Sequence, residues 1–285
     1  MRIAITGSGG YIAGNLIPSL ENMEHTILRI KRDDLNNEVF LLNTLSGIDA
    51  VIHLAGAPIL QRWTAKNKTE ILKSRVDSTS SITNAIRKLN PEERPKLFIS
   101  ASAIGIYKPN IVHTESSLSF ANDFVAEVVK KWENASENMP EQTRRVIFRI
   151  GLVIGSGAKT IENLNPVFKL GLGGKIASGN QPFPYIHVND AVNAIIWAIN
   201  HQSAKGKYNL AAPENISNKM FTKAFAEKLK RPAIFSVPAF VLKIAFGEAS
   251  VLLLKSPQVY PERLISEGFN FSYPTMQSAL DEIIK

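Results

Sequence analysis

The 285-residue sequence contains no cysteine, so it can hold no disulfide framework, thiolate nucleophile or cysteine-ligated metal site. Its five histidines lack HxH or HxxxH spacing, which disfavours a histidine metal site. It also lacks a long hydrophobic run. The most apolar stretch, residues 233–254, is interrupted by Pro238, Lys243, Gly247 and Glu248. A bilayer span needs ~20 mostly uninterrupted apolar residues, so we expect a buried or substrate-covering helix there.

No run of five basic residues occurs, although lysine and arginine exceed aspartate and glutamate by eight. This excess favours anionic partners such as phosphorylated cofactors or nucleotides, and its scattered distribution disfavours nucleic acid. The N-terminus leads directly into a glycine turn and does not resemble a signal peptide. We therefore expect a cytoplasmic protein with a small-molecule substrate and no membrane partner, whose oligomeric state stays open.

In the first half of the chain, short β-branched runs alternate with segments of helical spacing. Strands are expected at residues 3–6, 26–31, 50–54, 96–101 and 146–150, and helices at 11–21, 65–88 and 122–136. Strands that are hydrophobic throughout, such as AVIHLAG and RVIFRIG, are typical of a parallel sheet covered by helices on both faces. The alternation therefore predicts a doubly wound α/β fold of the Rossmann type.

After residue 157 the pattern loosens. Helices are expected at 190–200, 219–230 and 239–254, separated by loops rich in glycine and proline. Ligands of open α/β sheets bind beyond the carboxyl ends of the strands. We therefore predict a nucleotide-binding domain over residues 1–157 and a smaller substrate-side lobe over residues 158–285. The boundary is soft, because a late strand near 207–210 can return to the first domain.

The strongest motif is TGSGGYIA, which follows the first strand and opens the first helix. It fits G-x-x-G-x-x-A on Gly7, Gly10 and Ala13. Gly7 permits a tight turn, Gly10 lets the backbone approach a pyrophosphate, and the small Ala13 lets the helix pack closely on the strand. Because the phosphates would rest on free N–H groups at the helix N-terminus, the motif predicts dinucleotide binding.

The end of the second strand distinguishes between the two nicotinamide dinucleotides. An NAD site places an acid ~20 residues past the glycine turn, against the ribose 2′-hydroxyl, whereas an NADP site uses a cation. Here the strand TILRIK ends in Lys31 and Arg32, and Asp33 and Asp34 come only afterwards. Because a guanidinium can fork onto a 2′-phosphate, NADP(H) is favoured. The alternative is a solvated strand end.

Eight segments, taken in this order, resemble the "epimerase family protein" branch of the extended short-chain dehydrogenases/reductases. They are TGSGGYIA, VIHLAGAPI, RWTAKNKTEILKSR, ISASAIGIY, RIGLVIGSG, LGLGG, YIHVNDA and VYPERLISEGFNFSYPT. The resemblance covers essentially the whole chain, and LGLGG and RWT…SR are specific to the branch. It implies a Rossmann-type NADP-binding domain and a C-terminal extension on the substrate side.

The resemblance also implies cofactor contacts at defined positions. The glycine loop is expected on the pyrophosphate, the basic pair on the 2′-phosphate and the segment after the third strand beside the adenosine ribose. Two residues of TEILKSR are expected near the cofactor, and one further residue near the nicotinamide. These positions are Gly7, Ser8, Gly10, Tyr11, Ile12, Lys31, Arg32, Leu54, Ala55, Gly56, Glu70, Arg75 and Val153.

Short-chain dehydrogenases supply a proton through a Tyr-x-x-x-Lys pair, but no tyrosine of this sequence has lysine four residues later. In the helix where the pair is expected, Phe124 or Val125 stands in the place of the tyrosine. The resemblance implies that Ser102 orients a substrate carbonyl and that Tyr107 lines the substrate site, where it can donate a proton. The alternatives are a hydrogen-bonded loop hydroxyl for Ser102 and a strand-end cap for Tyr107.

Two functions follow from these features. The first is an NADP(H)-dependent oxidoreductase or nucleotide-sugar-epimerase-like enzyme, whose substrate is small and anionic or sugar-like. The second is an NADP(H)-binding sensor or interaction protein with little or no catalysis. The retained Ser102 favours the enzyme, and the missing Tyr-x-x-x-Lys pair favours the sensor. The sequence names neither the substrate nor the direction of the reaction.

Overall fold

Six parallel strands form the central sheet of the protein, whose residues 1–285 are all described by a computed structural model. In spatial order they are β2 (Thr26–Ile30), β1 (Arg2–Thr6), β3 (Ala50–His53), β4 (Leu97–Ala103), β6 (Arg144–Ile150) and β10 (Gly206–Leu210). The prediction of a doubly wound, Rossmann-type fold is confirmed. The five strands expected in the first half all form, with ends that differ by one to two residues from the prediction.

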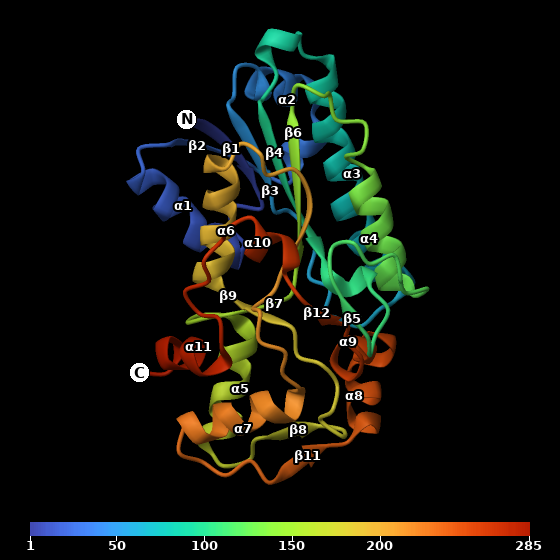
Figure 1. Cartoon of the computed structure of the whole chain (residues 1–285). Helices are drawn as coiled ribbons and strands as arrows, with labels where there is room; N and C mark the ends of the chain where they lie inside the picture. The colour runs from blue at the N-terminus through green and yellow to red at the C-terminus, as the bar shows by residue number, and fades with distance from the viewer.

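Helices cover both faces of the sheet (Figure 1). The helices α1 (Tyr11–Asn22) and α6 (Val188–Asn200) pack on one face, and α2 (Glu38–Leu45), α3 (Ala65–Lys88) and α4 (Phe124–Asn134) pack on the other. Because successive strand residues point to opposite faces, Ile3 and Ile5 join the core under α1 and α6, whereas Ala4 joins the core under α2 and α3. This double burial explains why the strands read as continuous hydrophobic runs.

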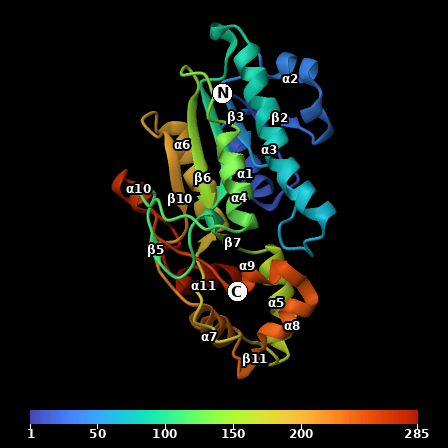
Figure 2. The ribbon, with the colours of Figure 1, turned by 90° about the vertical axis from the view of Figure 1, so that its right-hand side faces the viewer.

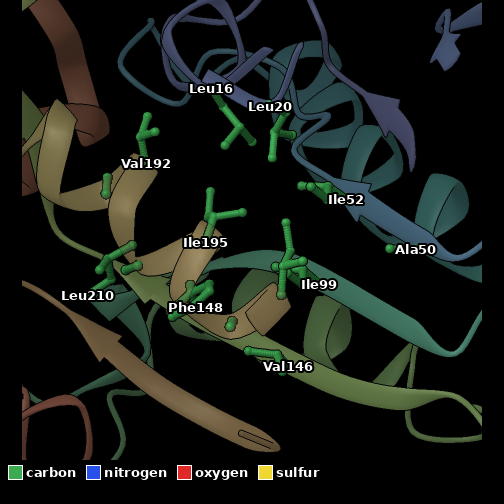
Figure 3. Close-up of a cluster of buried hydrophobic side chains, with 14 of the residues drawn as sticks. Leu16, Leu20, Ala50, Ile52, Ile99, Val146, Phe148, Val192, Ile195 and Leu210 are labelled. Atoms are coloured by element: carbon green, nitrogen blue, oxygen red, sulfur yellow. The ribbon is translucent and has the colours of Figure 1, made fainter. Parts of the chain in front are cut away.

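The core under α1 and α6 is the largest hydrophobic cluster. Figure 3 shows Leu16 and Leu20 of α1 facing Ile195 of α6, with Ile52 and Ile99 of the sheet nearby. Aliphatic side chains from helices and strands therefore interdigitate in this layer. The second large cluster lies on the other face and is built by Phe98, Val51 and the apolar side of α2 and α3.

The chain after β6 builds a second, smaller lobe that lies beyond the carboxyl ends of the strands (Figures 1 and 2). Its helices are α5 (Lys159–Lys169), α7 (Asn218–Lys228), α8 (Ala239–Phe246), α9 (Val251–Leu254) and α11 (Met276–Ile283). Two parallel pairs, β7 (Leu152–Ile154) with β9 (Tyr185–His187) and β8 (Gly174–Ile176) with β11 (Phe235–Val237), belong to this part of the chain.

Short elements complete the structure. The strands β5 (Val112–His113) and β12 (Gln258–Val259) pair in parallel, and α10 (Glu262–Ser266) packs beside β10. Single turns of 3-10 helix lie at η1 (Asp33–Asn36), η2 (Pro91–Glu93), η3 (Ile104–Ile106) and η4 (Gly247–Ser250). No helix combines the length and the apolar character that crossing a bilayer requires.

The late strand expected near 207–210 is β10, and it lies at the edge of the main sheet beside β6. The chain therefore leaves the sheet after Ile150, builds part of the smaller lobe and returns at Gly206. The helix α6 before this strand and the helix α10 after it also pack on the main sheet. The two lobes are consequently interleaved along the sequence.

The single helix expected at 239–254 is wrong, because Gly247 adopts a φ of +59°, which splits the segment into α8, the 3-10 turn η4 and α9. The expectation of a buried helix is also wrong, because Leu242 is the only buried residue of α8. The alternative, a helix that covers the substrate, stays a prediction. The helices α2, α5, α10 and α11 were not predicted. The periodic signal of α2 is weak, and α10 has only five residues. In α5 and α11 the apolar residues do recur at helical spacing, so the signal was present there and was missed.

The core under α1 and α6 offers a test of the fold. Ile195 is 1% exposed, so Ile195→Ala should lower the free energy of unfolding by about 2–5 kcal/mol, because it removes packed methyl groups and leaves a cavity. Val39 of α2 is 68% exposed, and Val39→Ala should change the free energy of unfolding by less than about 0.5 kcal/mol. Urea titration followed by circular dichroism measures both, and equal losses would contradict this assignment of the core.

Candidate functional site

The topology of the sheet places a crevice between β1 and β3. The strand β1 pairs with β2 on one side and with β3 on the other, so successive crossovers run in opposite directions from it. At such a switch point the loops after the two strands separate and leave room for a ligand. The loops here are the glycine turn after Thr6 and the segment that begins at Leu54.

Gly7 brings these two loops into contact. Its φ is +70°, and a Cβ at this position would lie 2.7–2.8 Å from backbone atoms of Leu54 and Ala55. Only glycine avoids both the conformational strain and the collision. Gly10 is the N-cap of α1 and provides no side-chain cap, so the N–H groups of the first helical turn remain available to an anion.

A cavity of about 670 Å³ opens at this switch point, which is within the size range of cofactor sites. The resemblance placed thirteen residues near the cofactor, and nine of them line this cavity: Gly7, Ser8, Gly10, Lys31, Arg32, Leu54, Ala55, Gly56 and Glu70. They come from four separate parts of the chain, so the fold assembles in one place what the sequence holds apart.

The basic end of β2 lies at this cavity. Arg32 forms an ion pair with Glu70 of α3, with 3.4 Å between Nη1 and Oε1, and both side chains are largely exposed. The backbone N–H of Lys31 donates to the carboxylate of Asp34 at 2.9 Å. Asp34 therefore stabilises the turn after the strand through the backbone of Lys31. The Arg32 side chain pairs only with Glu70, and the Lys31 side chain forms no ion pair.

Arg75 lies behind the loop after β3. It donates from Nη2 to the carbonyl of Ala57 at 2.9 Å and from Nη1 to the carbonyl of Ile71 at 3.1 Å. A Cβ at Gly56 would lie 3.2 Å from the Arg75 guanidinium carbon, so the absence of a side chain at Gly56 lets the two groups approach closely. Burial lowers the pKa of Arg75 to about 10, and no carboxylate forms an ion pair with it.

Three other predicted residues do not line the cavity. Tyr11 donates its hydroxyl to the carbonyl of Ser156 at 2.7 Å, and burial raises its pKa to about 12. Ile12 packs against the core under α1 and α6. Val153 lies in β7 opposite Ile186 of β9. Tyr11 thus links the first helical turn of the nucleotide side to the segment that follows β7.

His53 forms a hydrogen bond with Thr6, the residue that precedes the glycine turn. Its ring nitrogens lie 2.6 Å from the Thr6 hydroxyl and 3.0 Å from the Thr79 hydroxyl, and the residue is fully buried. Burial lowers its pKa to about 4, so the imidazole is neutral near pH 7. This histidine therefore acts as a hydrogen-bonded core residue that ties β1, β3 and α3 together.

Ser102 lies in a buried polar network on the α4 side of the sheet. Its hydroxyl donates to Glu133 Oε1 at 2.7 Å. Glu133 of α4 also accepts from Arg149 of β6, where Nε–Oε1 and Nη2–Oε2 are both 2.8 Å. The sheet register explains the meeting, because Ser102 and Arg149 are direct neighbours on β4 and β6. The result is a buried, bidentate ion pair with the serine hydroxyl attached to it.

Tyr107 extends the same network. Its hydroxyl accepts from Arg149 Nη1 at 2.7 Å and donates to Asn209 Oδ1 at 2.8 Å, and the residue is 1% exposed. The backbone N–H groups of Asn209 and Arg263 both donate to the carboxylate of Glu115. The two candidate catalytic residues are therefore brought together, but outside the cavity, with both hydroxyl groups hydrogen-bonded within the protein.

Electrostatics fix the protonation states in this network. Burial alone would raise the pKa of Glu133, but the hydrogen bonds and charge of Arg149, with the Ser102 hydroxyl, hold it below its usual range. Burial raises the pKa of Tyr107, and Arg149 offsets only part of that effect. Glu133 is therefore a carboxylate and Tyr107 a neutral phenol at pH 7.

The N-terminal part of α4, where the tyrosine and lysine were sought, is apolar. Val125 and Val129 lie one turn apart and are both buried. Val125 fills the space beside Gly105, where a Cβ would collide with its Cγ1 atom. No titratable group of this helix turn thus faces the end of β4 at these two positions.

Sequence reasoning missed one wall of the cavity. That wall is a polar stripe of α3, and it adds Lys73, Ser74, Asp77 and Ser78 to Glu70. These positions share a helix face, because they follow Glu70 by three, four, seven and eight residues. The signal was present as polar side chains at helical spacing, but such a stripe usually marks a solvated face.

Comparison with known proteins agrees with this geometry. The model of the NAD dependent epimerase/dehydratase family matches residues 3–211, and a model described as a domain of unknown function, DUF1731, matches residues 237–283. The chain is 32% identical over 295 residues to the epimerase family protein SDR39U1 of Bos taurus, with all of both chains covered. It is 31% identical over 297 residues to the epimerase family protein SH2119 of Staphylococcus haemolyticus, with 99% of each covered.

Among solved structures, the human epimerase family protein SDR39U1 with NADPH superposes with a TM-score of 0.93 at 31% identity, covering 100% of this chain and 99% of the other. A nucleoside-diphosphate sugar epimerase from Corynebacterium glutamicum superposes with a TM-score of 0.81 at 25% identity, covering 100% of this chain and 58% of the other. With its switch-point cavity, its sheet order and these matches, the chain belongs to the NAD dependent epimerase/dehydratase family.

Proposed function

We propose that this chain is an NADP(H)-dependent oxidoreductase or epimerase-like enzyme of the extended short-chain dehydrogenase type. The observation that carries the proposal is the switch-point cavity, where a glycine turn, a helix N-terminus and the basic pair Lys31 and Arg32 meet. A phosphorylated dinucleotide combines the anionic groups and the length that such a cavity can accommodate. The human relative described above, which is solved with NADPH, supports the choice.

Different residues of the cavity would bind different parts of the cofactor. Gly7, Ser8 and Gly10, with the first N–H groups of α1, would hold the pyrophosphate. The segment Leu54–Ala55–Gly56 would lie beside the adenosine ribose. The close approach between Gly7 and this segment supports the assignment, because it places the two loops side by side at the cavity that they line.

Arg32 would bind the 2′-phosphate. Its pair with Glu70 is exposed and long, and such pairs contribute little to stability, so the guanidinium is free to turn toward a stronger anion. Lys31 would add a second cation, and Glu70 would hold Arg32 in place at the cavity. Arg75 is a half-buried cation without a carboxylate partner, and the anionic cofactor would supply a negative charge nearby.

We also propose roles for the residues outside the cavity. Tyr11 and Ile12 would shape the first turn of α1, and Val153 would approach the nicotinamide end, since β7 directly follows the carboxyl end of β6. Residues 1–157 would act as the cofactor-binding domain and residues 158–285 as the substrate-side lobe, except for α6, β10 and α10, which pack on the main sheet. The substrate would be a small anionic or sugar-like molecule.

Bound nicotinamide would supply or accept a hydride at C4. Ser102 would orient the substrate carbonyl, and Tyr107 or a water molecule would exchange the proton. Both hydroxyl groups are occupied by Glu133 and Asn209, so each would have to leave its partner to reach a substrate. Catalysis by these residues therefore requires a local rearrangement of the network.

The second candidate function is an NADP(H)-binding sensor or interaction protein. The buried hydroxyl groups of Ser102 and Tyr107 and the apolar pair Val125 and Val129 favour it, because none of them offers a free proton donor. The cofactor site is the same in both functions. Only turnover distinguishes them.

The preference for NADP(H) can be tested at Arg32. Arg32→Ala should weaken NADPH binding by about 10- to 100-fold, because it removes charged hydrogen bonds to the 2′-phosphate, and should change NADH binding by less than about threefold. Isothermal titration calorimetry measures both affinities. Arg29→Ala is the matched control, since Arg29 lies in β2, three residues before Arg32, and pairs with Glu21 outside the cavity. Equal losses for the two coenzymes would refute the assignment.

Turnover distinguishes the enzyme from the sensor. If the chain is the enzyme, Ser102→Ala and Tyr107→Phe should each lower NADPH oxidation against a panel of carbonyl compounds by about 100-fold or more, because each removes an orienting or proton-donating hydroxyl. Ser100→Ala is the control, since Ser100 lies on the same strand and bonds only to the carbonyl of Ala101.

NADPH affinity, measured in parallel, reports whether each variant is folded. Tight NADPH binding by the wild type with no turnover across the panel would support the sensor and reject the enzyme. Turnover that survives in both hydroxyl variants would reject the roles assigned to Ser102 and Tyr107.

A further inference from the structure

The smaller lobe leaves a group of large apolar side chains unpacked. Ile234 is 81% exposed, Leu170 75%, Ile244 71% and Phe240 63%. Leu172, Phe235 and Val241 are exposed as well. We call these seven residues the apolar cap. A single exposed leucine is normal in a globular protein, but a concentration of this kind marks an interaction site.

The members of the apolar cap come from neighbouring segments. Gly171 lies next to Pro232, the side chain of Arg231 bonds to the carbonyl of Lys169, and β8 pairs with β11. The helix α8 follows β11 with only Pro238 between them. Figures 1 and 2 place β8, β11 and α8 in the part of the molecule farthest from α2.

The apolar cap is not needed to build the lobe. The core of the lobe consists of other side chains, among them Phe168, Phe221 and Phe225, and contains no residue of α8. The helix α8 contributes only Leu242 to the interior, although seven of its eight residues are apolar. An eight-residue helix with this composition gains little from exposure to water, so its sequence points to a partner outside the chain.

The segments that carry the apolar cap contain basic but no acidic residues. No aspartate or glutamate occurs in residues 163–189 or 228–247. Five cations lie in these two segments without a carboxylate within 4 Å: Lys169, Lys175, Lys230, Arg231 and Lys243. Unpaired cations beside exposed apolar groups favour a partner that is both anionic and apolar.

We propose that the apolar cap inserts into the headgroup region of an anionic lipid bilayer. The side chains of the apolar cap are 41–81% exposed, and a bilayer accepts such side chains without the matching groove that a protein partner would need. Apolar side chains can enter the boundary between headgroups and acyl chains, while lysine and arginine beside them bind anionic headgroups. The sequence predicted no membrane partner because it has no spanning segment. Attachment to the surface of a membrane does not need one.

The experiment is co-sedimentation of the full chain with two kinds of vesicle. One contains phosphatidylcholine alone, and the other contains about 25% phosphatidylglycerol in addition, which gives a clearly anionic surface. Binding to the anionic vesicles alone is expected. The double variants Phe240→Ser/Ile244→Ser and Leu170→Ser/Ile234→Ser should each abolish it. Lys230→Gln/Arg231→Gln should weaken it by about fivefold per removed cation.

The control variant is Val39→Ser, which removes an equally exposed apolar side chain from α2, far from the cap, and should bind vesicles like the wild type. NADPH affinity checks the fold of every variant. Equal binding to neutral and anionic vesicles, or binding that survives in the cap variants, overturns the proposal. A third result also overturns it: the wild type does not bind vesicles but is a dimer by light scattering, and the cap variants are monomers. The partner of the apolar cap is then a second copy of the chain.

Discussion

The close contact between Gly7 and the loop after β3 determines the shape of the cofactor side. A Cβ at Gly7 would collide with backbone atoms of Leu54 and Ala55, and backbone cannot move aside as the end of a flexible side chain can. The contact holds two loops together at the switch point of the sheet and forms one wall of the cavity. Arg32 at its edge and Arg75 behind Gly56 take their positions from these loops.

A second constraint holds part of the C-terminal segment on the sheet. Arg149 of β6 binds Glu133 and Tyr107, and Tyr107 continues through Asn209 of β10 toward Glu115, which accepts from the backbone of α10. A buried ion pair of this kind tolerates the loss of one partner poorly, because the remaining charge stays desolvated. The residues that hold the C-terminal segment on the sheet are thus also the candidates for catalysis, and they cannot serve both purposes in one conformation.

Most of the sheet was predictable from the sequence because its strands are buried on both faces. That double burial gives runs such as AVIH in β3, which stand out from helical spacing. The glycine turn was predictable for a related reason, since few residues tolerate the conformation of Gly7. The break at Gly247 was not, because the apolar run on both sides of it reads as one helix and only the packing of the lobe selects the positive φ.

The site was predictable where it depends on local backbone and not where it depends on distant partners. The backbone around Gly7 and Gly10 follows from the motif. The burial of Ser102, however, depends on Glu133, which lies 31 residues later and meets it only because α4 packs over β4. The polar face of α3 was missed for the same reason, since its meaning depends on the loop that it faces.

The late return of β10 has a consequence for biosynthesis. The strand β6 ends at Ile150, but the neighbour that completes the sheet starts only at Gly206. A nascent chain that has emerged as far as α5 therefore carries β6 as a bare edge with unpaired N–H and C=O groups. Such edges recruit strands from other chains, so the ribosome-bound half of this protein is its most aggregation-prone form.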